Sequence, residues 1–159
     1  MAAGMRPSTF RLSDYFTPAT IILALRSRSK PEVIRELLGT LELPAREELV
    51  ILRTILRREE MGSTGIGRGI AVPHGRTPLV SKLRVVYGRS TGGIAYDSMD
   101  GAPVHHVFLL VAPPTETSNE YLPVLGRIAK LAQDPEIPTR LSAVESVEEF
   151  LRVLADEER

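Results

Sequence analysis

The chain has 159 residues, 43% hydrophobic and 25% charged, which is ordinary globular composition with enough length for a real core. Twenty Lys and Arg balance twenty Asp and Glu, which argues against a dedicated nucleic-acid binder. There is no cysteine, which excludes disulfides, thiol nucleophiles and cysteine-based zinc sites. No apolar run approaches the roughly 20 residues of a membrane span, and residues 1–7 lack a signal-peptide core. We therefore expect a soluble, cytoplasmic protein without membrane insertion, with residues 1–7 frayed.

The N-terminal part of the chain predicts a short strand and then two helices. Apolar and polar residues alternate within 8–15, which favours a strand. Ser29–Glu32 has the pattern of a helix start, and apolar residues then recur at helical spacing as far as Leu41. After Pro44 a second apolar stripe predicts a helix that ends near Met61–Gly62.

The middle of the chain predicts strands. Four glycines within 62–69 exclude a stable helix there. Ile70–Val72 is typical of a short strand, and we expect Pro73 to end it. Residues 83–90 predict another strand, and 93–96 begin a further one.

The C-terminal part predicts a buried strand followed by helices. Residues 104–112 form the most apolar segment, and their length suits a central strand. Amphipathic spacing predicts a helix over about 122–131 and two more over 138–144 and 147–157. The order of elements indicates one domain over 1–159, with three layers and a sheet between helices.

The balanced net charge hides an asymmetry along the chain. Between Arg53 and Arg89 there are eight basic residues and two acidic ones. From Asp134 onward there are eight acidic residues and three arginines. The basic segment suits an anionic ligand or an acidic partner, although an uneven solvated surface would give the same pattern.

The sequence argues against two kinds of ligand site, a nucleotide-binding P-loop and a metal site at the adjacent histidines. The glycines of 62–69 have P-loop spacing, but Arg68 and Gly69 stand where a P-loop has a lysine and a hydroxyl residue. His105 and His106 are adjacent, so on a strand their side chains point to opposite faces and cannot chelate one ion together. We therefore expect no nucleotide cofactor and no metal, with one of these histidines in the core and the other at the surface.

His74 is the candidate nucleophile. A neutral imidazole can accept a phosphoryl group on a ring nitrogen near pH 7. Pro73 gives it a rigid position, Gly75 permits close backbone approach, and the glycine-rich loop can present amides to an anion. Arg58 can supply a charge-assisted fork of hydrogen bonds to phosphoryl oxygens. The residues alone leave open a structural histidine beside an unrelated turn.

The segment from Arg58 to Gly75 resembles the IIA domain of the fructose/mannitol class of the bacterial phosphoenolpyruvate-dependent phosphotransferase system, closest to its stand-alone nitrogen-regulatory branch. The family signature is an acid, six residues, then aliphatic-Gly-x-x-aliphatic-Ala-aliphatic-Pro-His-small. It is filled by Glu59, Ile66, Gly67, Ile70, Ala71, Val72, Pro73, His74 and Gly75. The resemblance extends over residues 8–156. It implies an α+β fold, a three-layer α/β/α sandwich with a mixed central sheet of four to five strands.

The resemblance also implies roles for site residues. His74 would accept a phosphoryl group from a histidine-containing phosphocarrier protein, on Nε2, with Nδ1 held by a backbone carbonyl. Arg58 matches the active-site arginine, and Ser63 and Thr64 lie in the loop that flanks the phosphohistidine. We expect these three residues to bind the phosphoryl group, and no cofactor to be needed.

Tyr121 marks a departure from the family pattern. The family usually has a second histidine at this position, just before the leucine that opens the helix. A phenol can donate a hydrogen bond to a phosphoryl group but stays neutral at pH 7. We include Tyr121 among the expected phosphate-binding residues, with simple packing of its ring as the alternative. The change bears on transfer rate, phosphohistidine lifetime and donation to a permease more than on slow regulatory phosphorylation.

The leading functional hypothesis is a phosphocarrier whose His74 phosphorylation state regulates other proteins. We expect no transporter segment and no fused donor domain, which favours regulation over sugar uptake. One alternative is a IIA subunit that donates phosphate to a fructose/mannitol-type sugar permease. Another is a binding module that has kept the fold and lost phosphotransfer. A hydrolase with His74 as base is disfavoured, because the sequence has no Gly-x-Ser-x-Gly elbow.

Overall fold

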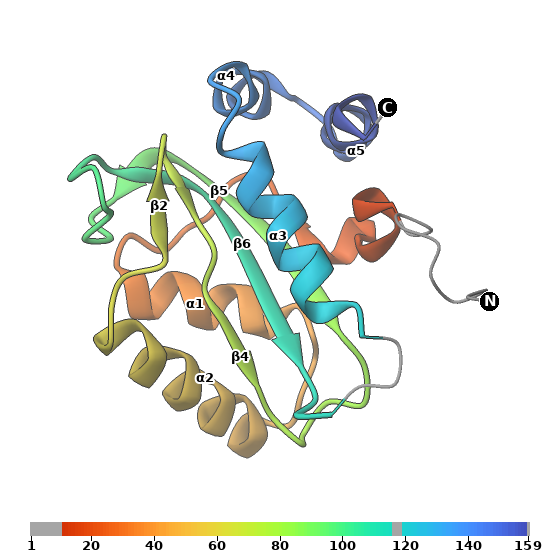
Figure 1. The fold of residues 1–159 in the computed structure, drawn as a ribbon. Coiled ribbons are helices and arrows are strands. Elements are labelled where there is room, and N and C mark those ends of the chain that lie inside the picture. Colours follow the sequence, from red (N-terminus) through yellow and green to blue (C-terminus); the bar gives the residue numbers. More distant parts are fainter. Residues whose placement is uncertain (1–10, 116–118, 159) are drawn as a thin grey trace.

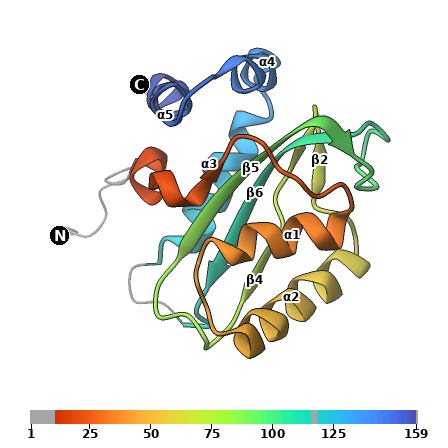
Figure 2. The same cartoon turned by 180° about the vertical axis from the view of Figure 1, so that it is seen from behind.

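A mixed β-sheet separates two layers of helices (Figures 1 and 2). The computed structural model describes residues 11–115 and 119–158. The α-helices are α1 (Lys30–Gly39), α2 (Ala45–Glu60), α3 (Tyr121–Leu131), α4 (Glu136–Ala143) and α5 (Val147–Glu157), and two short 3₁₀ segments are η2 (Leu12–Tyr15) and η3 (Pro18–Thr20). The strands are β1 (Ile21–Ile22), β2 (Gly65–Gly67), β3 (Ile70–Ala71), β4 (His74–Arg76), β5 (Arg84–Ile94) and β6 (Val104–Ala112).

Strand β6 lies at the centre of the sheet. It pairs antiparallel with β5 on one side and parallel with both β3 and β4 on the other. The strand order is β1-β5-β6-β3-β2, with β4 joined to β6 further along the same edge as β3. The three-layer α/β/α architecture and the mixed sheet are confirmed. The sheet has six strands among the described residues, against an expected four to five, because β1, β2 and β4 are only two or three residues long.

Alternate side chains of β6 enter two separate hydrophobic cores. Phe108 and Leu110 pack with η2, α3, α4 and α5, whereas Val107, Leu109 and Val111 pack with α1 and α2. Successive strand residues point to opposite faces, so a strand covered on both sides must be apolar almost throughout. This confirms the predicted buried central strand at 104–112.

The first two helices begin and end as their sequences predict. The Ser29 side chain accepts a hydrogen bond from the amide of Glu32, and Pro31 lies in the first turn of α1. Helix α2 ends at Glu60, and Met61 is its C-cap residue. Together the two helices cover one face of the sheet (Figure 2).

The strand predicted within 8–15 is wrong where the structure describes it. Residues 12–15 form a 3₁₀ turn, in which the amide of Asp14 bonds to the carbonyl of Arg11 at 2.9 Å. Leu12 is fully buried in the core next to α5, so its apolar side chain reflects burial of a turn and not of a strand. Residues 1–10, including those expected to fray, lie outside the described residues.

One strand boundary differs from expectation, and another agrees with it. The segments 83–90 and 93–96 belong largely to one strand, β5, whose register shifts between Arg89 and Ile94. Gly93, with φ of 87°, provides the irregular backbone at this bulge. The predicted end of the short strand at Pro73 is confirmed, because β3 ends at Ala71. The Pro73 carbonyl accepts from the Leu110 amide at 3.0 Å, and pairing with β6 resumes in a separate strand, β4.

Candidate functional site

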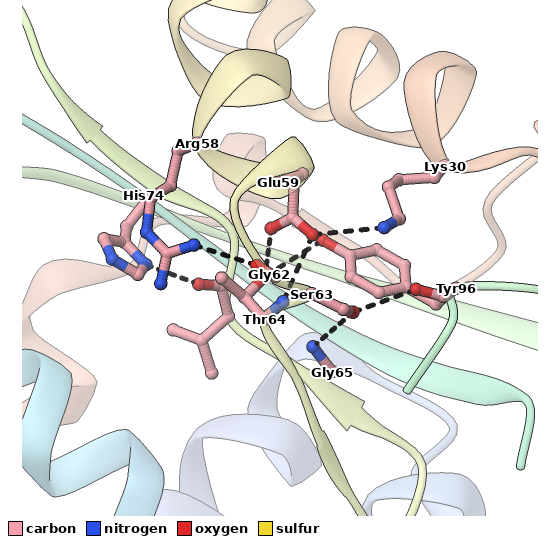
Figure 3. Close-up of polar contacts among 10 residues, drawn as sticks. Lys30, Arg58, Glu59, Gly62, Ser63, Thr64, Gly65, His74 and Tyr96 are labelled. Carbon is pink, nitrogen blue, oxygen red and sulfur yellow. Dashed lines mark hydrogen bonds and ion pairs between the residues drawn. The ribbon is translucent and has the colours of Figure 1, made fainter. Parts of the chain in front are cut away.

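The imidazole of His74 is held in one orientation by its own backbone. Its Nδ1 lies 2.7 Å from the carbonyl oxygen of Val72 (Figure 3). A carbonyl only accepts hydrogen bonds, so in the neutral ring Nδ1 carries the proton and Nε2 keeps its lone pair. The side chain is half-buried, at the first residue of β4. The ring is therefore arranged for attack through Nε2.

Helix α2 packs closely on β4, on the face of the sheet opposite to the His74 side chain. A Cβ at Gly75 would lie 3.2 Å from Cγ1 of Ile55, which is tighter than ordinary contact. Gly75 thus allows the close approach that its position predicts. Helix α2 then continues from Ile55 by three residues to Arg58, so both project from the same face of the helix.

Arg58 lies at the end of α2, where the glycine-rich loop begins. Its Nη1 donates to the carbonyl oxygen of Gly62 at 2.8 Å. Figure 3 shows Arg58 and His74 on the same side of the loop. The guanidinium has five N–H donors, and this bond uses only one end of the fork. A cationic group beside the loop suits an anion near the imidazole.

The hydroxyl of Ser63 links the glycine-rich loop to Tyr96, which lies two residues after the end of β5. It donates to the carbonyl oxygen of Tyr96 at 2.9 Å and accepts from the amide of Gly65 at 3.1 Å (Figure 3). The Ser63 side chain is thereby engaged within the protein in this structure. Its contact with a phosphoryl group remains a prediction.

A buried carboxylate, Glu59, holds the next residue of the loop. It accepts from the Thr64 amide at 3.2 Å, from the Thr64 hydroxyl, and from Nζ of Lys30 at 3.2 Å. The Thr64 hydroxyl also lies 3.2 Å from Oη of Tyr96, whose pKa is raised by burial and then by the nearby carboxylate. Thr64 is 5% exposed, so a phosphate contact through its side chain also remains a prediction.

Tyr121 lies against His74, as the first residue of α3. The two ring centroids are 6.2 Å apart, with the planes tilted by 60°. On the tyrosine ring rests the guanidinium of Arg76, with Cζ 4.4 Å from the ring centroid. Sequence reasoning missed Arg76, although its place two residues after His74 on a strand puts both on one face of the sheet.

The two adjacent histidines lie apart from this site. His106 is buried, with Nδ1 2.8 Å from the hydroxyl of Tyr87, whereas the half-buried His105 has Nδ1 2.8 Å from the carbonyl of Ser90. The expectation of a core histidine is confirmed for His106, whereas His105 is half-buried and not fully at the surface. Within 11–115 and 119–158, no group of three or more His, Asp or Glu side chains is placed to hold a metal ion. None of the helices described there is long and apolar enough to cross a membrane.

A comparison with known protein families identifies the family of this chain. The family model described as "Phosphoenolpyruvate-dependent sugar phosphotransferase system, EIIA 2" matches residues 14–157. The chain belongs to this EIIA type 2 family. The family resemblance of the segment from Arg58 to Gly75 is thereby confirmed.

Relatives of this EIIA type 2 chain include regulatory and sugar-specific proteins. It is 36% identical over 145 residues to a nitrogen regulatory protein of Bradyrhizobium diazoefficiens, covering 91% of this chain and 94% of that protein. It is 35% identical over 147 residues to the fructose-specific EIIABC component of Bacillus subtilis, covering 91% of this chain but 23% of that protein. The crystal structure of nitrogen regulatory protein IIA-Ntr from Neisseria meningitidis superposes with a TM-score of 0.81 at 29% identity, covering 90% of this chain and 98% of that one.

Proposed function

We propose that this EIIA type 2 protein is a phosphocarrier that accepts a phosphoryl group on Nε2 of His74 from a histidine-containing phosphocarrier protein. The observation that carries the proposal is the 2.7 Å contact between Nδ1 of His74 and the carbonyl of Val72, which leaves the Nε2 lone pair for attack. We take residues 1–159 as one IIA domain and the cytoplasm as its location.

The proposed step exchanges one phosphorus–nitrogen bond for another. The Nε2 lone pair of His74 attacks the phosphorus carried by the donor imidazole. The bond to the donor nitrogen breaks, and its electron pair returns to the donor ring. The Nδ1 proton of His74 stays on its bond to the Val72 carbonyl, so that bond stabilises the positive charge that develops on the ring. Arg58 supplies donors for the phosphoryl oxygens.

A regulatory role is the form of this function that we favour. Support comes from the nitrogen regulatory relative, which matches this chain over 94% of its own length. In such a role the phosphorylated and free forms of His74 differ in charge at the surface, and a partner protein distinguishes them. We identify that partner only by its chemistry, as a protein that binds the two charge states of His74 with different affinity.

Donation to a sugar permease is the second candidate. It is favoured by the 35% identity to the fructose-specific EIIABC component, in which this chain corresponds to 23% of the length. The third candidate, a binding module without phosphotransfer, is favoured by Tyr121 where the family has a histidine. The orientation of the His74 ring argues against this third candidate.

Phosphoryl uptake tests the proposal directly. The protein is incubated with phosphoenolpyruvate, the first enzyme of the system and its phosphocarrier, and intact mass is recorded. We expect one acid-labile, base-stable phosphoryl group, lost in His74→Ala and kept in His105→Gln. Uptake by His74→Ala would refute the site. No uptake from donors that phosphorylate another IIA protein would favour the binding module.

A further inference from the structure

We propose that Arg76 is a second phosphoryl-binding cation of the site, held in place by the ring of Tyr121. This inference rests on the proposed phosphorylation of His74. It assigns to Arg76 a role in the transfer step itself, through donation to the phosphoryl oxygens, and to Tyr121 a positioning role that acts through Arg76.

The strand geometry brings Arg76 to the reacting side of the sheet. His74 and Arg76 are the first and third residues of β4, so their side chains leave the same face. The partners of β4 on β6 are Leu110 for His74 and Ala112 for Arg76, and both belong to the core beneath α3. The two side chains therefore point toward the helix that begins with Tyr121.

The tyrosine ring is the common neighbour of the imidazole and the guanidinium. Its centroid is 6.2 Å from that of the His74 ring and 4.4 Å from Cζ of Arg76. Tyr121 is 6% exposed, so packing fixes the position of its ring. A guanidinium over the ring gains cation–π attraction.

A hydrogen bond to the backbone also helps to orient the guanidinium of Arg76. Nη1 of Arg76 donates to the carbonyl oxygen of Pro114 at 2.8 Å, just after the end of β6. Arg76 is exposed and lies in the basic segment between Arg53 and Arg89. A guanidinium that is held by a ring and a carbonyl loses little freedom when it binds an anion, and it keeps N–H donors besides the one that Pro114 accepts.

The arrangement separates the two roles of the pair. Arg76 supplies a positive charge and several N–H donors, whereas a phenol is neutral at pH 7 and has a single O–H donor. Tyr121 sets the position of that charge. Removal of either should slow transfer, and removal of both should cost no more than removal of Arg76 alone, because the ring acts through the guanidinium.

The test measures phosphorylation of the full chain by two donors. With the phosphocarrier protein, Arg76→Gln should lower kcat roughly 10-fold while KM stays within about twofold, as expected for a lost charge-assisted contact to the transferred group. With phosphoramidate, a small chemical donor of phosphoryl groups to imidazole, the rate should fall by a similar factor. The matched control is Arg46→Gln, which removes an exposed arginine at the other end of α2.

The possible results separate this inference from the proposed function. A raised KM with unchanged kcat and an unchanged phosphoramidate rate would make Arg76 a docking residue and overturn the inference. A Tyr121→Leu, Arg76→Gln double variant much slower than Arg76→Gln alone would overturn the positioning role of the ring. Absence of phosphorylation in the unaltered protein with both donors would overturn the proposed function, and this inference with it.

Discussion

Arg58 and its neighbour Arg57 provide a matched pair at the residue scale. Arg58 donates to the loop carbonyl of Gly62 at 2.8 Å, while Arg57 is exposed and lies on a different face of the helix. Loss of charge-assisted hydrogen bonds to the phosphoryl group should make phosphorylation of Arg58→Ala roughly 10- to 100-fold slower. Arg57→Ala should match the unaltered protein in the same donor assay. Equal phosphorylation rates for the two variants would show that Arg58 does not act in the phosphorylation site.

Glu59 allows a second comparison between neighbours. Its carboxylate binds Lys30 and two groups of Thr64, whereas Glu60 is exposed. Glu59→Gln removes the counter-charge of Lys30, whose side chain is 16% exposed, and weakens the bonds to Thr64, so the free energy of unfolding should fall by about 1–3 kcal/mol. Glu60→Gln should change it by less than about 0.5 kcal/mol. Urea unfolding of both variants measures the difference, and similar values would show that the buried network is not stabilising.

At the scale of elements, the contact between α1 and β5 depends on a missing side chain. A Cβ at Gly88 would lie 2.6 Å from Cδ2 of Leu37 on α1 and 2.9 Å from Cδ2 of Leu25. Gly88→Ala should therefore force the helix or its leucine to move, and should destabilise the protein by about 1–3 kcal/mol. Gly92→Ala, in the same strand with nothing within 4 Å of its added Cβ, is the control. Thermal or urea unfolding that ranks Gly92→Ala as the more destabilised variant would contradict this packing.

Elements were predictable where the signal was local. The helix start at Ser29, the end of α2 near Met61 and the apolar run of β6 all follow from spacing within a few residues. The strand predicted within 8–15 was wrong because it rested on the alternation of Phe10 and Leu12, and two apolar residues cannot specify a sheet partner. The end of β3 before Pro73 was predicted from local sequence, whereas the return of pairing in β4 depends on tertiary contacts with β6.

The site shows the same division between local and long-range information. His74 and the glycine-rich loop could be found from their motif, which lies within one segment of sequence. The ion pair of Glu59 with Lys30 joins residues 29 positions apart, and the stacking of Arg76 on Tyr121 joins two different elements. No pattern in a single sequence specifies such contacts, so they emerged only with the fold.

For the whole molecule, His106 couples folding to pH. Its pKa is lowered from 6.5 to about 4, chiefly because burial disfavours the imidazolium, and also because His105 and Arg89 repel it. Between these values an unfolded chain binds a proton that the folded chain does not. Stability should therefore fall as pH drops from 6.5 toward 4, with His106 contributing about 2 kcal/mol of the loss at pH 5.

Comparison with a variant isolates this contribution. His106→Gln removes the titrating group but keeps polar atoms near the hydroxyls of Tyr87 and Ser142. Urea unfolding at pH 7 and pH 5 should show a smaller acid-induced loss in His106→Gln than in the unaltered protein. The same loss in both would show that other groups account for the pH dependence.

The central claim is that the phosphoryl group resides on Nε2 of His74. The most direct measurement is nitrogen-15 and phosphorus-31 NMR of the phosphorylated protein, in which only three histidine rings need assignment. We predict coupling of phosphorus to Nε2 of His74, with the proton retained on Nδ1 against the Val72 carbonyl. Phosphorus on Nδ1, phosphorus on another residue, or no phosphorylation by active donors would contradict the account.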